Sequence, residues 1–223
     1  MGFEIKNIKK SYGKKQALTD VSFSIEKAHC IGILGKNGSG KSTLLTTLAG
    51  VQKCDNGEFL SDGENLFTNS KKCSELVGYV PQGTPLLEEL SAKDNLLLWY
   101  DRKSLKKELA DGVLKMLGID EFIKVPVKKM SGGMKKRLSI ACSIAKKPSL
   151  LLLDEPCAAL DLVCKQSIYS YLQAFKENGG SLILATHDES ELALCDVIYI
   201  LKDGVLIKYD YDGDTKRLVE MLK

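Results

Sequence analysis

The run GKNGSGKST at residues 35–43 limits the folds open to this chain more than any other feature. It fits the pattern GxxxxGK(S/T) at every fixed position, and it lies between an apolar run at 29–34 and a helical segment at 41–50. Glycines in such a loop let consecutive backbone amides point at phosphate oxygens, and the following helix N-terminus adds partial positive charge. The sequence therefore predicts a strand, loop and helix unit that binds the phosphates of a nucleotide.

The residues of this loop have separate expected roles. Lys41 would neutralise the β- and γ-phosphates, and Ser42 would ligate Mg²⁺, so ATP and Mg²⁺ are the expected cofactors. The other loop residues expected to bind the nucleotide are Gly35, Lys36, Asn37, Gly38, Ser39, Gly40 and Thr43.

A second apolar run ends in adjacent carboxylates. The sequence LLLLDEP at 150–156 predicts a buried strand that delivers Asp154 and Glu155 at its carboxyl end. Open parallel sheets bind ligands at that end of their strands, so both side chains are expected beside the phosphate loop. Asp154 would hold the Mg²⁺ shell, directly or through water, and Glu155 would polarise the attacking water. The sequence thus predicts hydrolysis as well as binding.

Strand and helix patterns alternate along most of the chain. Alternating segments at 3–8 and 21–25 predict an antiparallel β region, and helical spacing predicts an inserted helical subdomain at about 91–130. The later segments are expected as a helix at 131–146, a strand at 150–153, a helix at 161–177, a strand at 182–185, a short helix near 189–194, and strands at 197–201 and 205–209. This order predicts one α/β domain: a P-loop NTPase core with a mainly parallel sheet, built from residues 1–90 and 131–223.

From residue 12 to about 206, the motifs closely resemble those of the ATP-binding cassette (ABC) ATPases. MSGGM at 130–134 is similar to the signature motif of that family, and it lies shortly before LLLLDEP as the signature does. The resemblance implies that Ser131, Gly132 and Gly133 close on ATP held by a second ATP-binding subunit. An SGG sequence alone would indicate only a helix cap.

The resemblance implies further roles along the chain. Tyr12 would stack on adenine, and Gln82 in YVPQ would bind nucleotide and Mg²⁺. The loop at 158–161 would contact the second subunit, and His187 in ATHD would contact the γ-phosphate. The implied catalytic residues are Lys41, Glu155 and His187, and the implied Mg²⁺ ligands are Ser42, Gln82 and Asp154.

Four residues at three places depart from the family pattern. Met134 stands where the family usually has Gln, and because SGGM is common in exporter-type cassettes, it favours export. Cys157 replaces the usual Thr or Ser, and the pair at 162–163 replaces Pro and a basic residue. These last two departures bear on communication across the dimer, whereas every residue with a direct catalytic role is present.

Composition limits the partners. The 32 Lys and Arg residues nearly balance 29 Asp and Glu, and the basic pairs are scattered, so no nucleic-acid partner is expected. The longest apolar runs, 96–100 and 150–153, are far shorter than the roughly 20 residues that span a bilayer. The N-terminus does not resemble a secretory signal, and seven cysteines without metal-ligand spacing are expected to be reduced.

The resemblance therefore implies the ATP-hydrolysing subunit of an exporter, bound to a transmembrane permease subunit at the cytoplasmic face of the membrane. Two cassettes, identical or different, would meet head to tail around ATP. The apolar side chains of Leu86, Leu87, Trp99 and Tyr100 could contact the permease or fill the core. The alternatives are a cassette ATPase acting on nucleic acid, ribosomes or iron–sulfur assembly, and a nucleotide binder without hydrolysis.

Overall fold

A largely parallel sheet forms the centre of the computed structural model, which describes residues 2–186, 189–211, 213, 218 and 220–221. The strand order is β10–β9–β3–β8–β7–β6, and β10 is antiparallel to its neighbour β9 whereas the other pairs are parallel. The strands are β3 (Cys30–Leu34), β6 (Val77–Val80), β7 (Leu150–Asp154), β8 (Ser181–Ala185), β9 (Val197–Lys202) and β10 (Val205–Tyr209). Every residue of β3, β7 and β8 is buried, as expected of strands covered on both faces.

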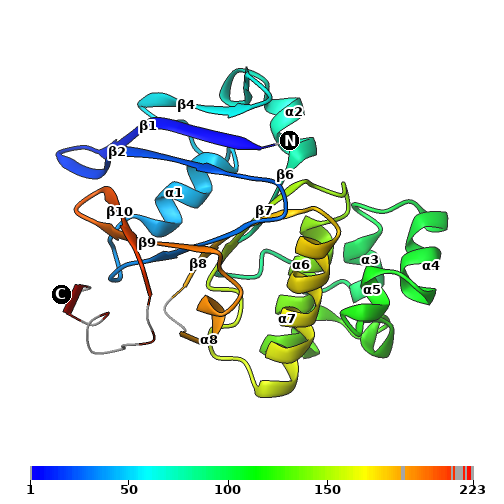
Figure 1. Cartoon of the computed structure of the whole chain (residues 1–223). Coiled ribbons are helices and arrows are strands. Elements are labelled where there is room, and N and C mark those ends of the chain that lie inside the picture. Colours follow the sequence, from blue (N-terminus) through cyan, green and yellow to red (C-terminus); the bar gives the residue numbers. More distant parts are fainter. Residues whose placement is uncertain (1, 187–188, 212, 214–217, 219, 222–223) are drawn as a thin grey trace.

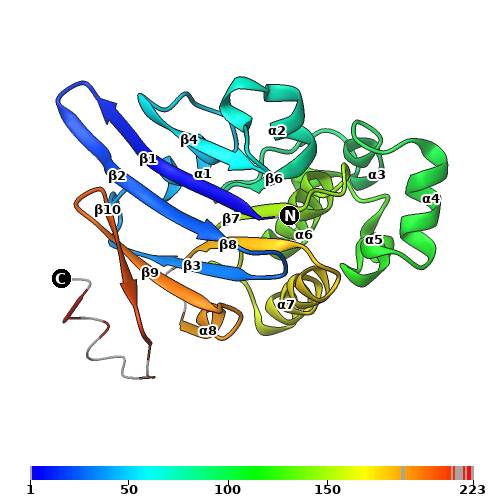
Figure 2. The same cartoon turned by 45° about the horizontal axis from the view of Figure 1, so that its top comes forward.

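A second, antiparallel sheet covers one face of the first. It has the order β2–β1–β4–β5, with β1 (Phe3–Tyr12), β2 (Lys15–Ile25), β4 (Asn56–Ser61) and β5 (Glu64–Asn65). Helix α1 (Lys41–Leu48) lies between the two sheets (Figures 1 and 2). Its Leu44, Leu45 and Leu48 are fully buried in a core shared with both sheets. This packing fixes the start of α1, and therefore the phosphate loop, beneath the end of β1.

Helices cover the other face and one side of the central sheet (Figure 1). Helices α6 (Gly132–Ser143) and α7 (Leu162–Glu177) pack on the sheet, and α8 (Glu189–Leu192) follows β8. Beside them lie α3 (Ala92–Leu96), α4 (Arg102–Ala110), α5 (Val113–Met116) and the 3₁₀ turns η2 (Ile119–Phe122) and η3 (Val127–Lys129). Their buried side chains join those of α6 and α7 in one continuous core.

The predicted α/β fold is confirmed, with one difference in detail. The sequence patterns predict no element over 56–80, yet this segment contains β4, β5, η1 (Leu66–Thr68), α2 (Ser70–Leu76) and β6.

Of the two alternatives for Tyr100, permease contact or core, the structure supports the core. The residue is 9% exposed, and its hydroxyl donates to the Ala141 carbonyl at 2.9 Å. Within the described residues, no helix combines the length and apolarity needed to cross a bilayer.

Candidate functional site

The strand order brings the main motifs to one edge of the central sheet. Strand β8 lies between β3 and β7 and is parallel to both. The phosphate loop follows β3, and Asp154 and Glu155 come at the end of β7. Because the carboxyl ends of parallel strands share an edge, residues more than a hundred positions apart in the chain meet there.

A cavity of about 470 Å³ at this edge is lined by most of the predicted nucleotide-binding residues. Its lining residues are Tyr12, Lys15, Ala17, Asn37, Gly38, Gly40, Lys41, Ser42, Thr43, Gln82 and Glu155. Gly35, Lys36 and Ser39 instead line a neighbouring cavity of about 270 Å³, which shares Asn37 and Gly38 with the first. One chain thus joins an aromatic ring, a phosphate loop and a carboxylate around a single space.

Lys41 is held at the base of the loop. Only 5% of the residue is exposed, and its ammonium donates to the carbonyls of Gly35 at 2.7 Å and Lys36 at 3.3 Å. Burial lowers the pKa of Lys41, and the nearby carboxylates oppose that shift. The side chain is therefore a fixed cation in a site where positive charge is little screened by water.

Gly40 is required by the tight approach between the loop and β2. Its φ is +110°, and a Cβ atom there would lie 2.6 Å from the Ala17 carbonyl oxygen. Both the left-handed backbone and the lack of space exclude a side chain. The glycine therefore lets the loop close and begin α1 directly at Lys41.

Asp154 and Ser42 lie in contact where a metal ion would be needed. Asp154 is 3% exposed and accepts a hydrogen bond from the Ser42 hydroxyl. Burial raises the pKa of the Asp154 carboxyl, and that hydrogen bond opposes the shift. Mg²⁺ prefers oxygen ligands and is commonly bound by one or two carboxylates together with substrate phosphates. One hydroxyl and one carboxylate beside a phosphate loop fit this ion.

Glu155 has a strained backbone and a defined partner. Its φ of +47° is unusual for a residue with a side chain, and its amide donates to the Ala185 carbonyl at 2.8 Å. The Gln82 amide nitrogen donates to the Glu155 carboxylate at 2.8 Å. This turn and this hydrogen bond together aim the carboxylate into the cavity.

Lys136 belongs to the same network, although its place in the basic run 135–137 predicts a solvated side chain. It lies on α6, is 5% exposed, and donates to the carbonyls of Pro81 and Gln82, both at 2.9 Å. Gly133 and Ile140 on the same helix face are buried too, and this helical spacing is the signal that could have identified it. Lys136 thus ties α6 to the segment that holds Gln82.

The MSGGM residues do not line the cavity of their own chain. Ser131 is exposed and caps α6 by accepting a hydrogen bond from the Met134 amide at 3.3 Å. A Cβ atom on Gly133 would lie 2.2 Å from the Cys164 sulfur, so packing against α7 requires that glycine, whereas Gly132 has open space. Ser131 and Gly132 therefore face outward at a helix N-terminus.

The remaining predicted site residue, His187, lies outside the described residues, as does the Asp188 that follows it. The residue before them, Thr186, is buried, and its amide donates to the Ile33 carbonyl at 3.1 Å. The described part of the ATHD motif therefore ends at the edge of the sheet that carries the cavity.

Comparison with known proteins gives a consistent result. A family model described as ABC transporter matches residues 18–158. Linearmycin resistance ATP-binding protein LnrL of Bacillus subtilis is 34% identical over 209 residues, covering 92% of this chain and 67% of that protein. Lantibiotic transport ATP-binding protein SrtF of Streptococcus pyogenes is 33% identical over 212 residues, covering 94% of this chain and 91% of that protein.

Two further matches bear on transport direction and on assembly. The probable sulfate/thiosulfate import ATP-binding protein CysA of Chlorella vulgaris is 34% identical over 214 residues, covering 93% of this chain and 90% of that protein. Among solved structures, a dimeric ATP-binding cassette in a post-hydrolysis state with ADP and Pi has a TM-score of 0.84 at 28% identity, covering 95% of this chain and 99% of that chain.

Proposed function

The chain belongs to the ABC transporter family, and we propose that it is the ATP-binding and ATP-hydrolysing subunit of a transporter whose membrane-spanning part is a separate protein. The observation that carries this proposal is the single cavity shared by Tyr12, the phosphate loop, Gln82 and Glu155. It offers a stacking surface for a base, amides and a fixed cation for phosphates, and a carboxylate where water would attack.

Each side chain would have a defined part in hydrolysis. Lys41 would turn from loop carbonyls to the β- and γ-phosphates, and Glu155, aimed by Gln82, would orient the attacking water and accept its proton. Ser42, Gln82 and Asp154 would hold Mg²⁺, which neutralises charge on the transferred phosphoryl group when it is bound. Lys41 and Glu155 line the same cavity, so these two catalytic groups would act on one bound nucleotide.

A second cassette would complete the site. Ser131 and Gly132 are exposed and do not line the cavity of their own chain, which supports a head-to-tail dimer in which they cap ATP held by the other subunit. A dimeric cassette with ADP and Pi bound is structurally similar to this chain, which further supports the arrangement. ATP would then drive association because its γ-phosphate contacts both subunits.

A permease subunit would contact the helical region around α3. Leu87 is 53% exposed and Trp99 is 57% exposed, and both lie close in sequence to α3. Leu98, next to Trp99 in the chain, is 60% exposed. A contiguous exposed apolar patch would mark contact with another protein or a membrane. Such a partner would hold the chain at the cytoplasmic face of the membrane, where ATP is available.

For the direction of transport, we infer export. Met134 in place of the usual Gln supports it, as do relatives named for lantibiotic transport and linearmycin resistance. A relative named for import is equally similar, so overall identity does not separate the two directions. The relatives are named as ATP-binding proteins of transport or resistance, which favours transport over a role on nucleic acid or ribosomes.

The proposal is tested by Glu155→Gln, which keeps the size and a carbonyl acceptor for Gln82 but removes the charge. The variant should still bind ATP, but it should release phosphate at least about 100-fold more slowly, because it lacks the general base. The matched control is Glu177→Gln, at the exposed end of α7. If Glu155→Gln and Glu177→Gln release phosphate at the same rate, the assignment of the site is wrong.

A further inference from the structure

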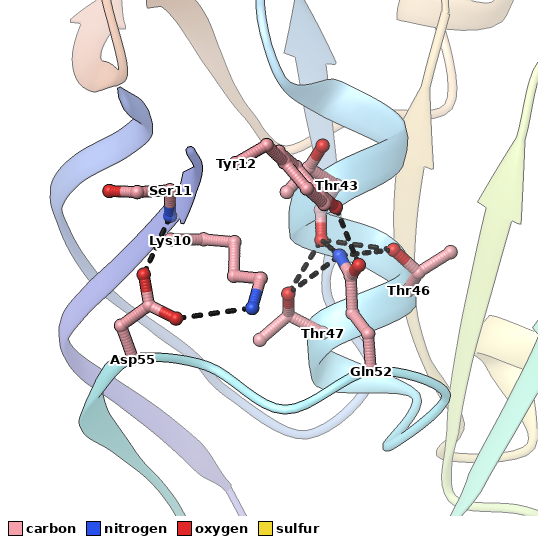
Figure 3. Close-up of polar contacts among 8 residues, drawn as sticks. All are labelled: Lys10, Ser11, Tyr12, Thr43, Thr46, Thr47, Gln52 and Asp55. Atoms are coloured by element: carbon pink, nitrogen blue, oxygen red, sulfur yellow. Dashed lines mark hydrogen bonds and ion pairs between the residues drawn. The ribbon is translucent and has the colours of Figure 1, made fainter. Parts of the chain in front are cut away.

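Gln52 links the end of β1 to helix α1 from outside the cavity. It lies in the connection between α1 and β4, and its half-buried side chain reaches between the two elements (Figure 3). Its amide oxygen accepts a hydrogen bond from the Tyr12 hydroxyl at 2.5 Å. Its amide nitrogen lies 3.0 Å from the Thr43 carbonyl, 2.8 Å from the Thr46 hydroxyl and 3.1 Å from the Thr47 hydroxyl.

The surroundings fix which way round the Gln52 amide lies. The Thr46 and Thr47 hydroxyls already donate to carbonyls one turn earlier in α1, so they are available as acceptors. If the amide were flipped, its oxygen would face the Thr43 carbonyl, and two acceptors would repel each other. The amide oxygen must therefore point at Tyr12, where it accepts from the phenol.

The backbone leading to Tyr12 is fixed as well (Figure 3). The Asp55 carboxylate accepts hydrogen bonds from the Ser11 amide at 2.7 Å and from the Lys10 ammonium at 3.1 Å. The same ammonium lies 5.6 Å from the centre of the Tyr12 ring. Gln52 thus holds the hydroxyl of Tyr12, and Asp55 holds the backbone just before it. Both contacts act on a residue that is 50% exposed.

We propose that Gln52 is a positioning residue for the nucleobase, which holds the Tyr12 ring in register with the phosphate loop. This inference rests on the proposed nucleotide site, since Tyr12 lines the same cavity as Lys41 and Ser42. Three of the four groups that bind the Gln52 side chain belong to α1, the helix whose N-terminus holds the phosphates. Gln52 therefore sets the distance between the surface that stacks on the base and the loop that binds the triphosphate.

The hydrogen bond matters because Tyr12 lies at an exposed strand end. Without it, the phenol could adopt other rotamers, and the base would have to order the ring on binding. Inorganic tripolyphosphate carries the same phosphates but no base, so its affinity should not depend on the ring. The ratio of ATP affinity to tripolyphosphate affinity consequently separates positioning of the ring from support of the loop.

The experiment measures both affinities by calorimetry on the full chain. Gln52→Leu and Tyr12→Phe each remove the hydrogen bond while keeping a side chain of similar size. Each should lower the affinity for ATP about threefold to tenfold and leave the affinity for tripolyphosphate unchanged. The double variant should bind ATP no more weakly than either single variant, because both remove the same interaction. Gln173→Leu, the same substitution on an exposed position of α7, should behave like wild type.

Each outcome of this experiment decides a separate question. If Gln52→Leu lowers the affinity for tripolyphosphate as much as the affinity for ATP, Gln52 acts through α1 and the inference is wrong. The inference is also wrong if the losses of ATP affinity from the two single variants multiply in the double variant. If Gln52→Leu binds ATP as tightly as Gln173→Leu does, the inference also fails. If the wild-type chain binds neither ligand, the proposed function itself fails.

Discussion

Replacing Lys136 by Met should slow ATP hydrolysis and lower stability, and it should reduce ATP affinity by less than it reduces turnover. The ammonium of Lys136 donates to the Pro81 and Gln82 carbonyls at 2.9 Å each, and Met has a similar length but no donor. Burial lowers the pKa of Lys136, which shows that the buried charge itself is unfavourable. Removing that charge therefore offsets part of the loss in the free energy of unfolding. The net cost of two unsatisfied carbonyls is about 1–3 kcal/mol. For a domain of this size, that corresponds to a melting temperature lower by roughly 2–12 °C.

The effect on turnover follows from the position of Gln82. The same residue that accepts from Lys136 through its carbonyl donates to the Glu155 carboxylate through its side chain. A small displacement of a positioning group can slow a reaction by up to about 100-fold, so we expect at least a tenfold loss of turnover. Because Gln82 is also an expected Mg²⁺ ligand, ATP affinity should fall as well. It should fall less than turnover, because the phosphate contacts of Lys41 do not pass through Lys136.

The assay is steady-state phosphate release over a range of ATP concentrations, with thermal melting on the same samples. Lys135→Met is the matched control, because the Lys135 ammonium forms a partly exposed ion pair with Glu88 at 3.4 Å, and such a pair contributes about 0–1 kcal/mol. If Lys136→Met and Lys135→Met have the same turnover, Lys136 does not position Gln82. If Lys136→Met loses ATP affinity as strongly as turnover, its effect reaches the phosphate loop, and the reasoning is refuted.

Two further substitutions have opposite expected effects on stability, both measured by thermal melting. Gly133→Ala should lower the free energy of unfolding by about 1–3 kcal/mol, because its Cβ would lie 2.2 Å from the Cys164 sulfur. Gly132→Ala should melt like wild type, because its Cβ would lie 4.0 Å from the Leu160 side chain. Equal melting temperatures for the two variants would contradict this. Asp154→Asn should raise the melting temperature of the nucleotide-free chain, because burial disfavours the ionised form of Asp154. The same substitution should remove the increase in melting temperature that Mg²⁺ with ATP confers. A lower melting temperature for Asp154→Asn would refute the account of this carboxyl.

The phosphate loop and the DEP segment could be predicted because each motif specifies its local structure. A strand must precede the loop and a helix must follow it, and β3 and α1 occupy these positions. Two motifs that bind one substrate must then lie close together at one edge of the sheet. The motifs do not indicate that β8 lies between β3 and β7, which the structure shows.

The hairpin of β4 and β5 was missed although its signal is present in the sequence. Asp62 and Gly63, with φ of +49° and +81°, form the kind of Asp-Gly turn that typically connects antiparallel strands. Strand β6 is harder to predict, since a run of four residues does not distinguish a strand from part of a helix.

Helical spacing indicates that Lys136 lies on the buried face of α6, but no local pattern predicts the partners of Lys136 or Gln52. Gln52 meets Tyr12 across 40 positions, and Lys136 meets Gln82 across 54. A polar residue in a connection or a basic residue on a helix is most often solvated, and only the packing of distant elements makes these two exceptions. Sequence motifs therefore identify the groups that contact the substrate better than the groups that hold them in place.

The most direct test of the central claim, an ATP site assembled from two subunits, uses Lys41→Ala and Ser131→Arg in one mixture. Each homodimer should be defective at both sites, because every site lacks either its fixed cation or its MSGGM cap. In the heterodimer, one site carries both lesions and the other carries none. Once heterodimers are shown to form, vanadate-trapped ADP should rise well above that of either variant alone. Trapping no greater than the two variants measured separately would show that Ser131 does not act in the partner's site.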